Sequence, residues 1–360
     1  MLHFVDTNGP GITRKKMRLG WGYFTPAGER IKDREEIDRL NKVGMPPAYE
    51  RCWFSPDPQG HLQGYGFDAR GRKQYRYHPE YRAQQDSRKY EKLADFGRAL
   101  PKLRKKIEED IQGRTPSRDT VVAAVVRLID ETHIRVGNEE YARDNKSFGA
   151  TTLRNRHAKV EGGTVKLSYV GKHGIKRTVV VSDRNLARIA KRTQDLPGQH
   201  LFEFVGDDGE VHPVTSTEVN AYIKEATDGD FTAKDFRTWG ATAIAFEELL
   251  KRAGEAGKAT MHLKAVVEPV AEALGNTAAM SRKSYIHPAI IEAAKDAEGF
   301  DPGKLPRVGK HLSAVERGLI DFLDALPAVE AEGEAKVEAK QAEGESRAQA
   351  EAEVAQEAGG

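Results

Sequence analysis

The stretch LGNTAAMSRKSYIHP, residues 274–288, holds a single tyrosine, Tyr285, close behind Arg282 and Lys283. Its second and third residues, Gly-Asn, are a common helix stop, so a break precedes the tyrosine. A tyrosine on a helix usually packs in a core or at an interface, and that use does not require two neighbouring cations. If Tyr285 has a chemical role, other parts of the chain must supply its partners.

Three other segments carry polar side chains that could surround Tyr285. HIRVGNEEY spaces Arg135 and Asn138 at i and i+3, which predicts that they share one face of a helix. YVGKHGIKR predicts a β-hairpin with Lys172 at its tip, because the glycines on both sides allow a tight turn. KDFRTWGAT places Arg237 in a helical run between bulky aromatic residues. Taken singly, these are an ordinary surface arginine, a solvated loop lysine and a buried arginine paired with an acid.

The order of these residues is more specific than any one of them. Arg…Lys…Arg…Asn…Tyr, within one helical domain that carries a β-hairpin, resembles the catalytic domain of type IB DNA topoisomerases, most closely the small poxvirus-like members found in bacteria. The segments that look like family motifs span nearly all of the chain before its tail: PGITRKK, GRKQYRY, RVGNEEY, TLRNRH, VGKHGIKR, KDFRTW and LGNTAAMSRKSYIHP. KDFRTW with Arg237, followed about fifty residues later by Tyr285 of the last motif, is highly specific.

The resemblance implies that the chain relaxes supercoiled DNA by cutting one strand, forming a 3′-phosphotyrosyl link and resealing, without ATP, metal or another cofactor. Tyr285 matches the nucleophile, and Arg135 and Arg237 match the arginines that hold the phosphate oxygens. Lys172 matches the general acid that protonates the departing 5′ oxygen. Asn276 lies where many relatives carry histidine. It either donates a neutral hydrogen bond to a phosphate oxygen or only supports the turn that ends the preceding helix.

These residue types suit the implied chemistry. A free tyrosine hydroxyl has a pKa of about 10, so it attacks phosphorus poorly at neutral pH unless its oxyanion is stabilised. Phosphoryl transfer is helped mainly by positioning and by positive charge near the oxygens that become more negative. A guanidinium stays charged and can bridge two oxygens in one plane. The chain has no HExxH, no paired CxxC and no tight Asp/Glu cluster of the kind that holds two magnesium ions, so we expect no metal site.

The resemblance also implies contacts with double-stranded DNA, because GRKQYRY is similar to the family's DNA-contacting strand. The implied contacts are Arg72, Gln74, Tyr75 and Tyr77, and less directly Tyr141, Arg154, His157 and Lys234. Strand alternation puts Tyr75 and Tyr77 on the same face, and such a pair more often faces a core. We expect a monomer whose two domains close around the duplex as a clamp.

The pattern of elements predicts an α+β fold. Residues 17–78 read as short strands between turn signals, with one helical insert that starts at Asp33. Residues 117–326 are mainly helical and carry a β-rich island, HAKVEGGTVKLSYVGKHGIKRTVVVS. We therefore expect a small β-rich N-terminal DNA-clamp domain, a mainly helical catalytic domain of the tyrosine recombinase and topoisomerase IB type, and a disordered Ala/Glu-rich tail, at residues 1–90, 91–326 and 327–360.

The net charge of +2 hides an asymmetry. Residues 328–360 hold nine glutamates and three basic residues, a net charge of −6, which leaves +8 for residues 1–327. A basic body indicates an anionic partner, most commonly nucleic acid. The single cysteine, Cys52, excludes an intramolecular disulfide and fits a reducing compartment. No apolar run approaches the roughly 18 residues of a membrane span, and no secretory signal is visible. We expect a bacterial, cytoplasmic, nucleoid-associated protein.

Two alternatives remain open from the sequence. Tyrosine recombinases share the Arg…Lys…Arg…Tyr order, but they usually show a His-x-x-Arg box, and this chain has Lys234 where the histidine would be. A β-rich N-terminal domain is also atypical of a recombinase. A basic nucleoid-binding protein without catalysis would explain the +8 body but not the five ordered residues. Relaxation of a supercoiled plasmid in EDTA without ATP would separate the enzyme from the binding protein.

Overall fold

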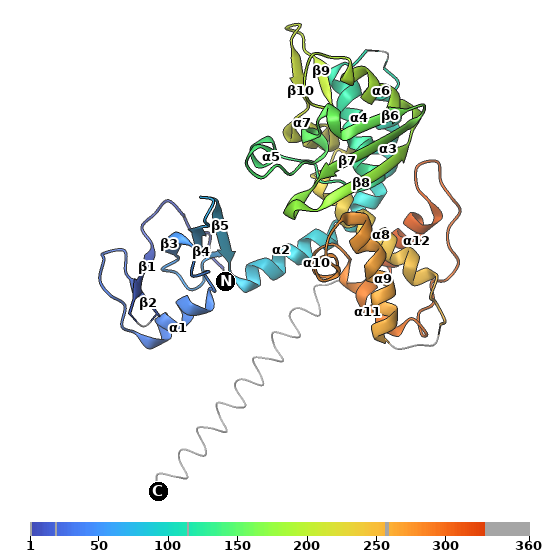
Figure 1. Ribbon diagram of the computed structural model, residues 1–360. Helices are drawn as coiled ribbons and strands as arrows, with labels where there is room; N and C mark the ends of the chain where they lie inside the picture. The colour runs from blue at the N-terminus through green and yellow to red at the C-terminus, as the bar shows by residue number, and fades with distance from the viewer. Residues whose placement is uncertain (1, 19, 114, 256–258, 328–360) are drawn as a thin grey trace. The chain divides into compact units, whose positions relative to one another are not determined.

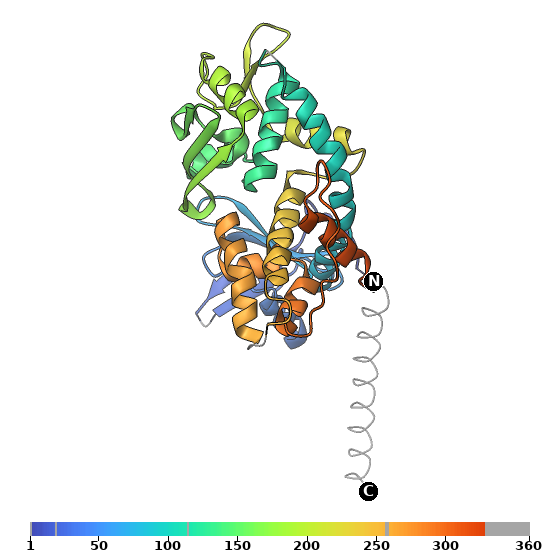
Figure 2. The same ribbon diagram turned by 90° about the vertical axis from the view of Figure 1, so that its right-hand side faces the viewer.

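The structure is a computed structural model that describes residues 2–18, 20–113, 115–255 and 259–327 (Figures 1 and 2). The acidic tail that we expected to be disordered lies outside the described residues, apart from Pro327. The chain divides into two compact units after Lys92. Within the described ranges, no helix has both the length and the apolar character needed to cross a lipid bilayer.

The first unit is built on a five-stranded antiparallel sheet of order β2-β1-β3-β4-β5, with two helices. Its elements are β1 (Ile12–Met17), β2 (Gly20–Phe24), α1 (Arg34–Lys42), β3 (Glu50–Phe54), β4 (Leu62–Phe67), β5 (Lys73–Tyr77) and α2 (Pro79–Glu91). Asp33 caps α1 as predicted, since its carboxylate accepts the backbone N–H groups of Glu35 and Glu36. Tyr23 and Phe54 of the sheet and Leu40 of α1 belong to one buried core.

One predicted strand of this unit is wrong in its bounds. The sequence MRLGWGYFT, residues 17–25, predicts one strand, whereas the structure has β1 ending at Met17 and β2 beginning at Gly20. Met17 pairs with Gly20, so the chain reverses between them, and Gly20 has a left-handed φ of 102°. Four side chains of β1 are polar and exposed or half-buried, so its sequence does not read as a strand. Pairing with β2 and β3 imposes the strand conformation instead.

The second unit is mainly helical and contains a three-stranded antiparallel sheet of order β6-β7-β8 and a short β9-β10 pair. Its helices are α3 (Leu93–Asp110), α4 (Arg118–Thr132), α5 (Glu139–Asn145), α6 (Arg184–Gln194), α7 (Ser216–Thr227), α8 (Ala233–Leu250), α9 (Ala259–Leu274), α10 (Ala278–Ser284), α11 (Pro288–Ala293) and α12 (Ala314–Asp324). Its strands are β6 (Ala158–Glu161), β7 (Thr164–Val170), β8 (Lys176–Ser182), β9 (Glu203–Val205) and β10 (Val211–Pro213).

Helix α8 lies at the centre of this unit. It packs against α3, α4 and α7 and against α9, α11 and α12 (Figure 1). Its residues are buried on several sides, including Phe236, Trp239 and Phe246, which is why its apolar pattern is not confined to one face. A side chain on α8 is therefore held by several neighbouring elements at once.

The predicted β-rich island is confirmed as β6, β7 and β8. Tyr169 of β7 stands opposite Arg177 of β8, and Val170 stands opposite Lys176, so the strands are paired up to the connecting loop. The sequence did not predict β9 and β10, because three residues per strand are too few to show an alternating pattern.

Candidate active site

The five residues expected in the site come from separate elements of the second unit. A cavity of about 470 Å³ is lined by Arg135, Lys172, Arg237 and Tyr285. The side chain of Asn276 joins them through a hydrogen bond, since Nη2 of Arg135 donates to its Oδ1 over 2.8 Å. Residues that are 150 positions apart in the chain, Arg135 and Tyr285, are thus brought to one place.

Arg135 does not lie on a helix, which corrects the expectation that it shares a helical face with Asn138. Helix α4 ends at Thr132, and α5 begins only at Glu139. Asn138 is the N-cap of α5, where its side-chain oxygen accepts the backbone N–H of Tyr141. The carbonyl of Arg135 accepts the N–H of Ala150, so the intervening residues bond to another segment rather than continue the helix.

Arg237 lies near the start of α8 and is only 4% exposed. Its Nη1 donates to the carbonyl of His133, and its Nη2 lies 3.4 Å from the carbonyl of Leu274. Burial, together with the positive charge of Arg135, lowers the pKa of Arg237 to about 10, which still leaves the guanidinium protonated at neutral pH. The buried cation is therefore held in place mainly by backbone oxygens.

His133 is a site residue that the sequence did not reveal. It ends α4 in a left-handed conformation with a φ of 53°, which turns its carbonyl toward Arg237. Its imidazole packs on Gly240 of α8, where a Cβ atom would lie 2.6 Å from its Nε2. Burial lowers the pKa of His133, so the ring beside the Arg237 cation favours its neutral form. The sequence around His133 is Thr-His-Ile, which lacks the glycine that usually marks a left-handed helix end.

Tyr285 directly follows α10 and lies against the cation of Arg237. The Arg237 Cζ atom is 5.0 Å from the centre of the Tyr285 ring. Burial alone would raise the pKa of Tyr285, but the charges and hydrogen bonds of Arg237 and Arg135 outweigh burial, so the pKa is lowered. Thr242, which is fully buried on α8, donates to the Tyr285 carbonyl over 3.2 Å and fixes the backbone of the tyrosine.

Asn276 follows a glycine turn at the end of α9. Gly275 has a φ of 60°, and its N–H donates a hydrogen bond to the carbonyl of Glu272. The N–H of Asn276 donates to the carbonyl of Ala271. These are the two bonds of a Schellman motif, with glycine at the left-handed position. The Asn276 side chain takes no part in the turn. Its Oδ1 accepts from Arg135, while its Nδ2 is buried and has no hydrogen-bond partner among the described residues.

Lys172 lies in the loop between β7 and β8, at the predicted hairpin tip, and its side chain is exposed. The N–H of Gly171 donates to the carbonyl of Ile175, which closes the loop, and His173 and Gly174 have left-handed φ values of 65° and 76°. Below the loop is a cavity of about 20 Å³, room for about one water, which Lys172 lines with Arg135 and Arg237.

Of the four DNA contacts expected in this unit, two line the cavity and two are engaged with other side chains of the protein. Tyr141 and Lys234 line the same cavity as Tyr285. Arg154 is instead engaged within the protein, where its guanidinium pairs with Glu139 and contacts the ring of His200. His157 packs edge-on against Phe148, and its Nδ1 accepts the N–H of Arg154.

The expected DNA contacts of the first unit lie on β5 and the turn before it. Arg72 and Gln74 both bond to the carboxylate of Asp68. Tyr75 and Tyr77 are 45% and 42% exposed and stack on each other, so they do not face the core as paired tyrosines more often do. The face of β5 that carries these two rings is therefore partly open to solvent.

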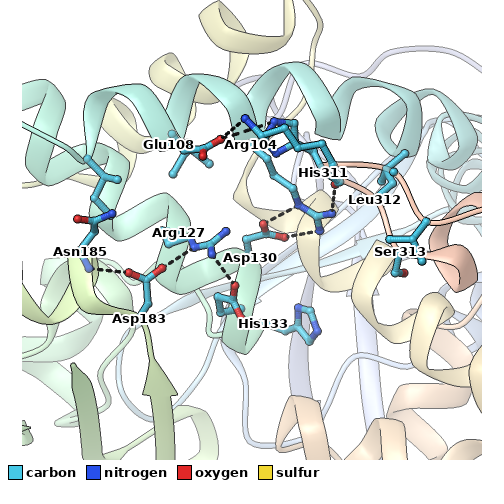
Figure 3. A pocket seen from close by; sticks show the side chains of 16 residues that line it. Arg104, Glu108, Arg127, Asp130, His133, Asp183, Asn185, His311, Leu312 and Ser313 are labelled. Carbon is cyan, nitrogen blue, oxygen red and sulfur yellow. Dashed lines mark hydrogen bonds and ion pairs between the residues drawn. The ribbon is translucent and has the colours of Figure 1, made fainter. Parts of the chain in front are cut away.

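A third cavity, of about 710 Å³, lies between α3, α4 and residues 308–313 (Figure 3). It contains none of the five expected residues, and its charged groups are already paired. Arg104 bonds Asp130, and Arg127 bonds Asp183. Of the side chains discussed above, only that of His133 reaches it. In the described part of the chain, no cluster of three or more His, Cys, Asp or Glu side chains could hold a metal ion.

Comparison with known proteins identifies the family. Residues 78–299 match the sequence profile of the eukaryotic DNA topoisomerase I catalytic core, and residues 20–68 match that of the bacterial DNA topoisomerase IB N-terminal domain. The DNA topoisomerase 1B of Acanthamoeba polyphaga mimivirus is 30% identical over 287 residues, which cover 77% of this chain and 85% of the relative. The chain belongs to the type IB DNA topoisomerases. It is therefore an enzyme that acts on DNA, as the resemblance of its motifs predicted.

Two further similarities were found. The DNA topoisomerase 1B of vaccinia virus (strain Copenhagen) is 22% identical over 260 residues, 71% of this chain and 78% of the viral protein. A crystal structure of the XerH site-specific recombinase bound to its difH substrate matches with a TM-score of 0.34 and 19% identity, covering 54% of this chain and 52% of the recombinase. Membership in the topoisomerase family sets the recombinase and the non-catalytic alternatives aside.

Proposed function

We propose that Tyr285 is the nucleophile of this topoisomerase and that Arg135, Lys172, Arg237 and Asn276 complete its catalytic set. The observation that carries the proposal is that the Tyr285 ring lies against the Arg237 cation, 5.0 Å from its Cζ, at a cavity that Arg135 and Lys172 also line. Positive charge at the phenol oxygen stabilises its anion, which is the form that attacks phosphorus.

In the cleavage step, the Tyr285 oxygen bonds to phosphorus while the bond from phosphorus to the 5′ oxygen breaks. The phenol proton leaves to water, and a proton from the Lys172 ammonium passes to the departing 5′ oxygen. The guanidinium groups of Arg135 and Arg237 bind the other phosphate oxygens, which become more negative in the transition state. The buried Nδ2 of Asn276 supplies one more donor.

Resealing reverses these transfers. The 5′ hydroxyl attacks phosphorus and returns its proton to the Lys172 amine, while the tyrosinate leaves and regains a proton from water. The phosphotyrosyl bond keeps the energy of the broken backbone bond, so neither direction needs ATP. Between the two steps the cut strand can rotate around the intact one, which relaxes supercoils.

The same proposal gives the first unit a DNA-holding role, with residues 1–90 as the clamp domain and residues 91–326 as the catalytic domain of a cytoplasmic, nucleoid-associated monomer. The exposed pair Tyr75 and Tyr77 would contact the duplex, together with Arg72 and Gln74. Arg154 would have to exchange Glu139 for a phosphate, while Lys234 and Tyr141 already face the cavity.

Tyr285→Phe tests the central assignment, with Tyr141→Phe as a control that removes another phenol from the same cavity. We expect Tyr285→Phe to bind DNA, to form no covalent adduct after denaturation, and to relax no plasmid in EDTA without ATP. Tyr141→Phe should still form the adduct. A 3′-linked adduct in Tyr285→Phe would reject Tyr285 as the nucleophile.

A further inference from the structure

Arg177 joins the hairpin that carries Lys172 to the end of helix α9. From β8 its Nη1 donates to the carbonyl of Glu272 over 2.8 Å, and its Nη2 donates to that of Ala273 over 2.7 Å. The last carbonyls of a helix have no partner within it, and the planar fork of a guanidinium can bond two of them at once. One side chain therefore fixes the hairpin to the helix that leads into Asn276.

The glycine at the end of α9 makes this contact possible. A Cβ atom on Gly275 would lie 2.8 Å from the Cζ of Arg177, closer than any side chain could approach. The guanidinium thus lies on the bare backbone of the residue directly before Asn276. Gly275 serves two purposes, the left-handed turn and the close approach of Arg177.

The opposite strand supports the same contact. Tyr169 faces Arg177 across the β7-β8 ladder and is 8% exposed, so its buried ring packs beside the strand position that carries the guanidinium. Burial raises the pKa of Tyr169, so its phenol stays neutral and is not a second nucleophile. The Tyr169 and Arg177 pair is followed by only one more pair before the loop of Lys172. The docking point is therefore at the base of that loop.

We propose that Arg177 is a positioning residue that sets where Lys172 stands relative to the scissile phosphate. The inference rests on the proposed role of Lys172 as the general acid. Arg177 itself touches no reacting atom. By holding the hairpin on the end of α9, it fixes the Lys172 loop relative to Asn276, which in turn bonds Arg135. Loss of Arg177 should thus impair mainly the protonation of the leaving oxygen.

The test compares two duplexes that differ in one atom at the cleavage site, oxygen or sulfur at the bridging 5′ position. A sulfur leaving group needs little protonation, so it bypasses a defect in the general acid. We would measure single-turnover cleavage by wild type, Lys172→Ala, Arg177→Ala and Lys176→Ala. Lys176 is exposed at the adjacent position, so its variant controls for the loss of a positive charge on the same strand.

We expect Arg177→Ala to slow cleavage of the oxygen substrate by roughly ten- to a hundredfold, less than the roughly 10²- to 10⁴-fold typical of losing a general acid itself. The sulfur substrate should recover most of that loss, and Lys176→Ala should behave as wild type. Equal slowing on both substrates, or no slowing, would overturn the role of Arg177. If sulfur fails to rescue Lys172→Ala, the general-acid assignment is wrong instead.

Folding is followed in parallel by thermal unfolding of each variant. If Arg177→Ala does not fold, Arg177→Gln keeps one donor toward α9, and it should show a smaller defect with the same preference for rescue by sulfur. An Arg177→Gln variant that is folded but slowed equally on both substrates would also reject the inference.

Discussion

At the residue scale, the backbone and the side chain of Asn276 have separate roles. Because Gly275 carries the left-handed turn, the Asn276 side chain is free for another use, and its Nδ2 is buried without a partner in the described structure. We predict that Asn276→Ala slows cleavage by roughly ten- to a thousandfold, the range for losing one such donor. Asn276→His should keep much of the rate, because histidine can also donate. Single-turnover cleavage measures both.

The competing role of Asn276, support of the turn, has a different signature. If only the turn mattered, Asn276→Gly would remain nearly fully active and Asn276→His would destabilise the fold. Thermal unfolding of the three variants should instead change little while their cleavage rates diverge. A fully active glycine variant would remove Asn276 from the catalytic set.

The lowered pKa of Tyr285 predicts a pH effect. Wild type should show a tyrosine that ionises at lower pH than an ordinary tyrosine, and this transition should be missing from Tyr285→Phe in an absorbance titration of tyrosinate. Arg135→Ala should move it to higher pH. The pKa of Tyr285 is lower in the folded chain than in the unfolded chain, so its ionisation stabilises the fold. This stabilisation is complete above the unfolded pKa and is lost as the pH falls through the folded pKa. A titration identical in wild type and Tyr285→Phe would contradict the prediction.

The sequence predicts the side chains of the site, but not the hydrogen bonds to backbone carbonyls that orient them. Tyr285, Arg135, Lys172 and Arg237 were predicted by side-chain type and order, and the structure brings them together. The contacts that orient them were not predicted, because they use backbone carbonyls, as between Arg237 and His133. Every residue has a carbonyl, so no residue type marks which one faces an arginine.

At the element scale, α8 depends on one glycine for its approach to α4. A Cβ on Gly240 would meet the ring of His133, whose carbonyl holds Arg237. We predict that Gly240→Ala costs about 1–3 kcal/mol of overpacking, partly offset by about 1 kcal/mol of helix propensity. Cleavage should slow by roughly tenfold or more, because moving a supporting group by about 1 Å can cost far more than that.

Gly318→Ala on α12 is the matched control for Gly240→Ala. Its Cβ would meet mainly the methyl end of Leu305, whereas a Cβ on Gly240 would meet three atoms of the His133 ring. Denaturant unfolding and single-turnover cleavage should separate the two variants. Cleavage slowed equally by both would mean that general loosening, not displacement of His133, is the cause.

Helices and strands with a long periodic pattern could be predicted from the sequence. Helix ends that are set by hydrogen bonds to a distant segment could not. The helical run around Arg237 and the hairpin of Lys172 have the expected form. The segment 133–138 does not, because hydrogen bonds to residues 150 and 151 replace the helical ones. Such bonds join positions about fifteen apart, beyond the reach of local periodicity.

At the scale of the whole molecule, charge is divided unevenly between the body and the tail. Residues 1–327 carry a net charge of +8, and residues 328–360 carry −6 with nine glutamates. The tail's carboxylates are tethered to the body, so their local concentration near the DNA-binding surfaces stays high at any protein concentration. They can compete with DNA phosphates for the same cations.

Truncation after Pro327 tests this competition. We predict that the shortened chain binds a nonspecific duplex more tightly at low salt, by roughly fivefold, which corresponds to about 1 kcal/mol of exposed electrostatics. The gain should fade as the Debye length falls to about 8 Å near 0.15 M salt, because screening weakens both the tail and the phosphates. The cleavage rate of bound DNA should not change, since the five proposed catalytic residues all lie before the cut.

Replacing the nine glutamates with glutamine in the full-length chain should reproduce the effect if charge is the cause. Equal affinity of the full and shortened chains at low ionic strength would leave the tail without this role.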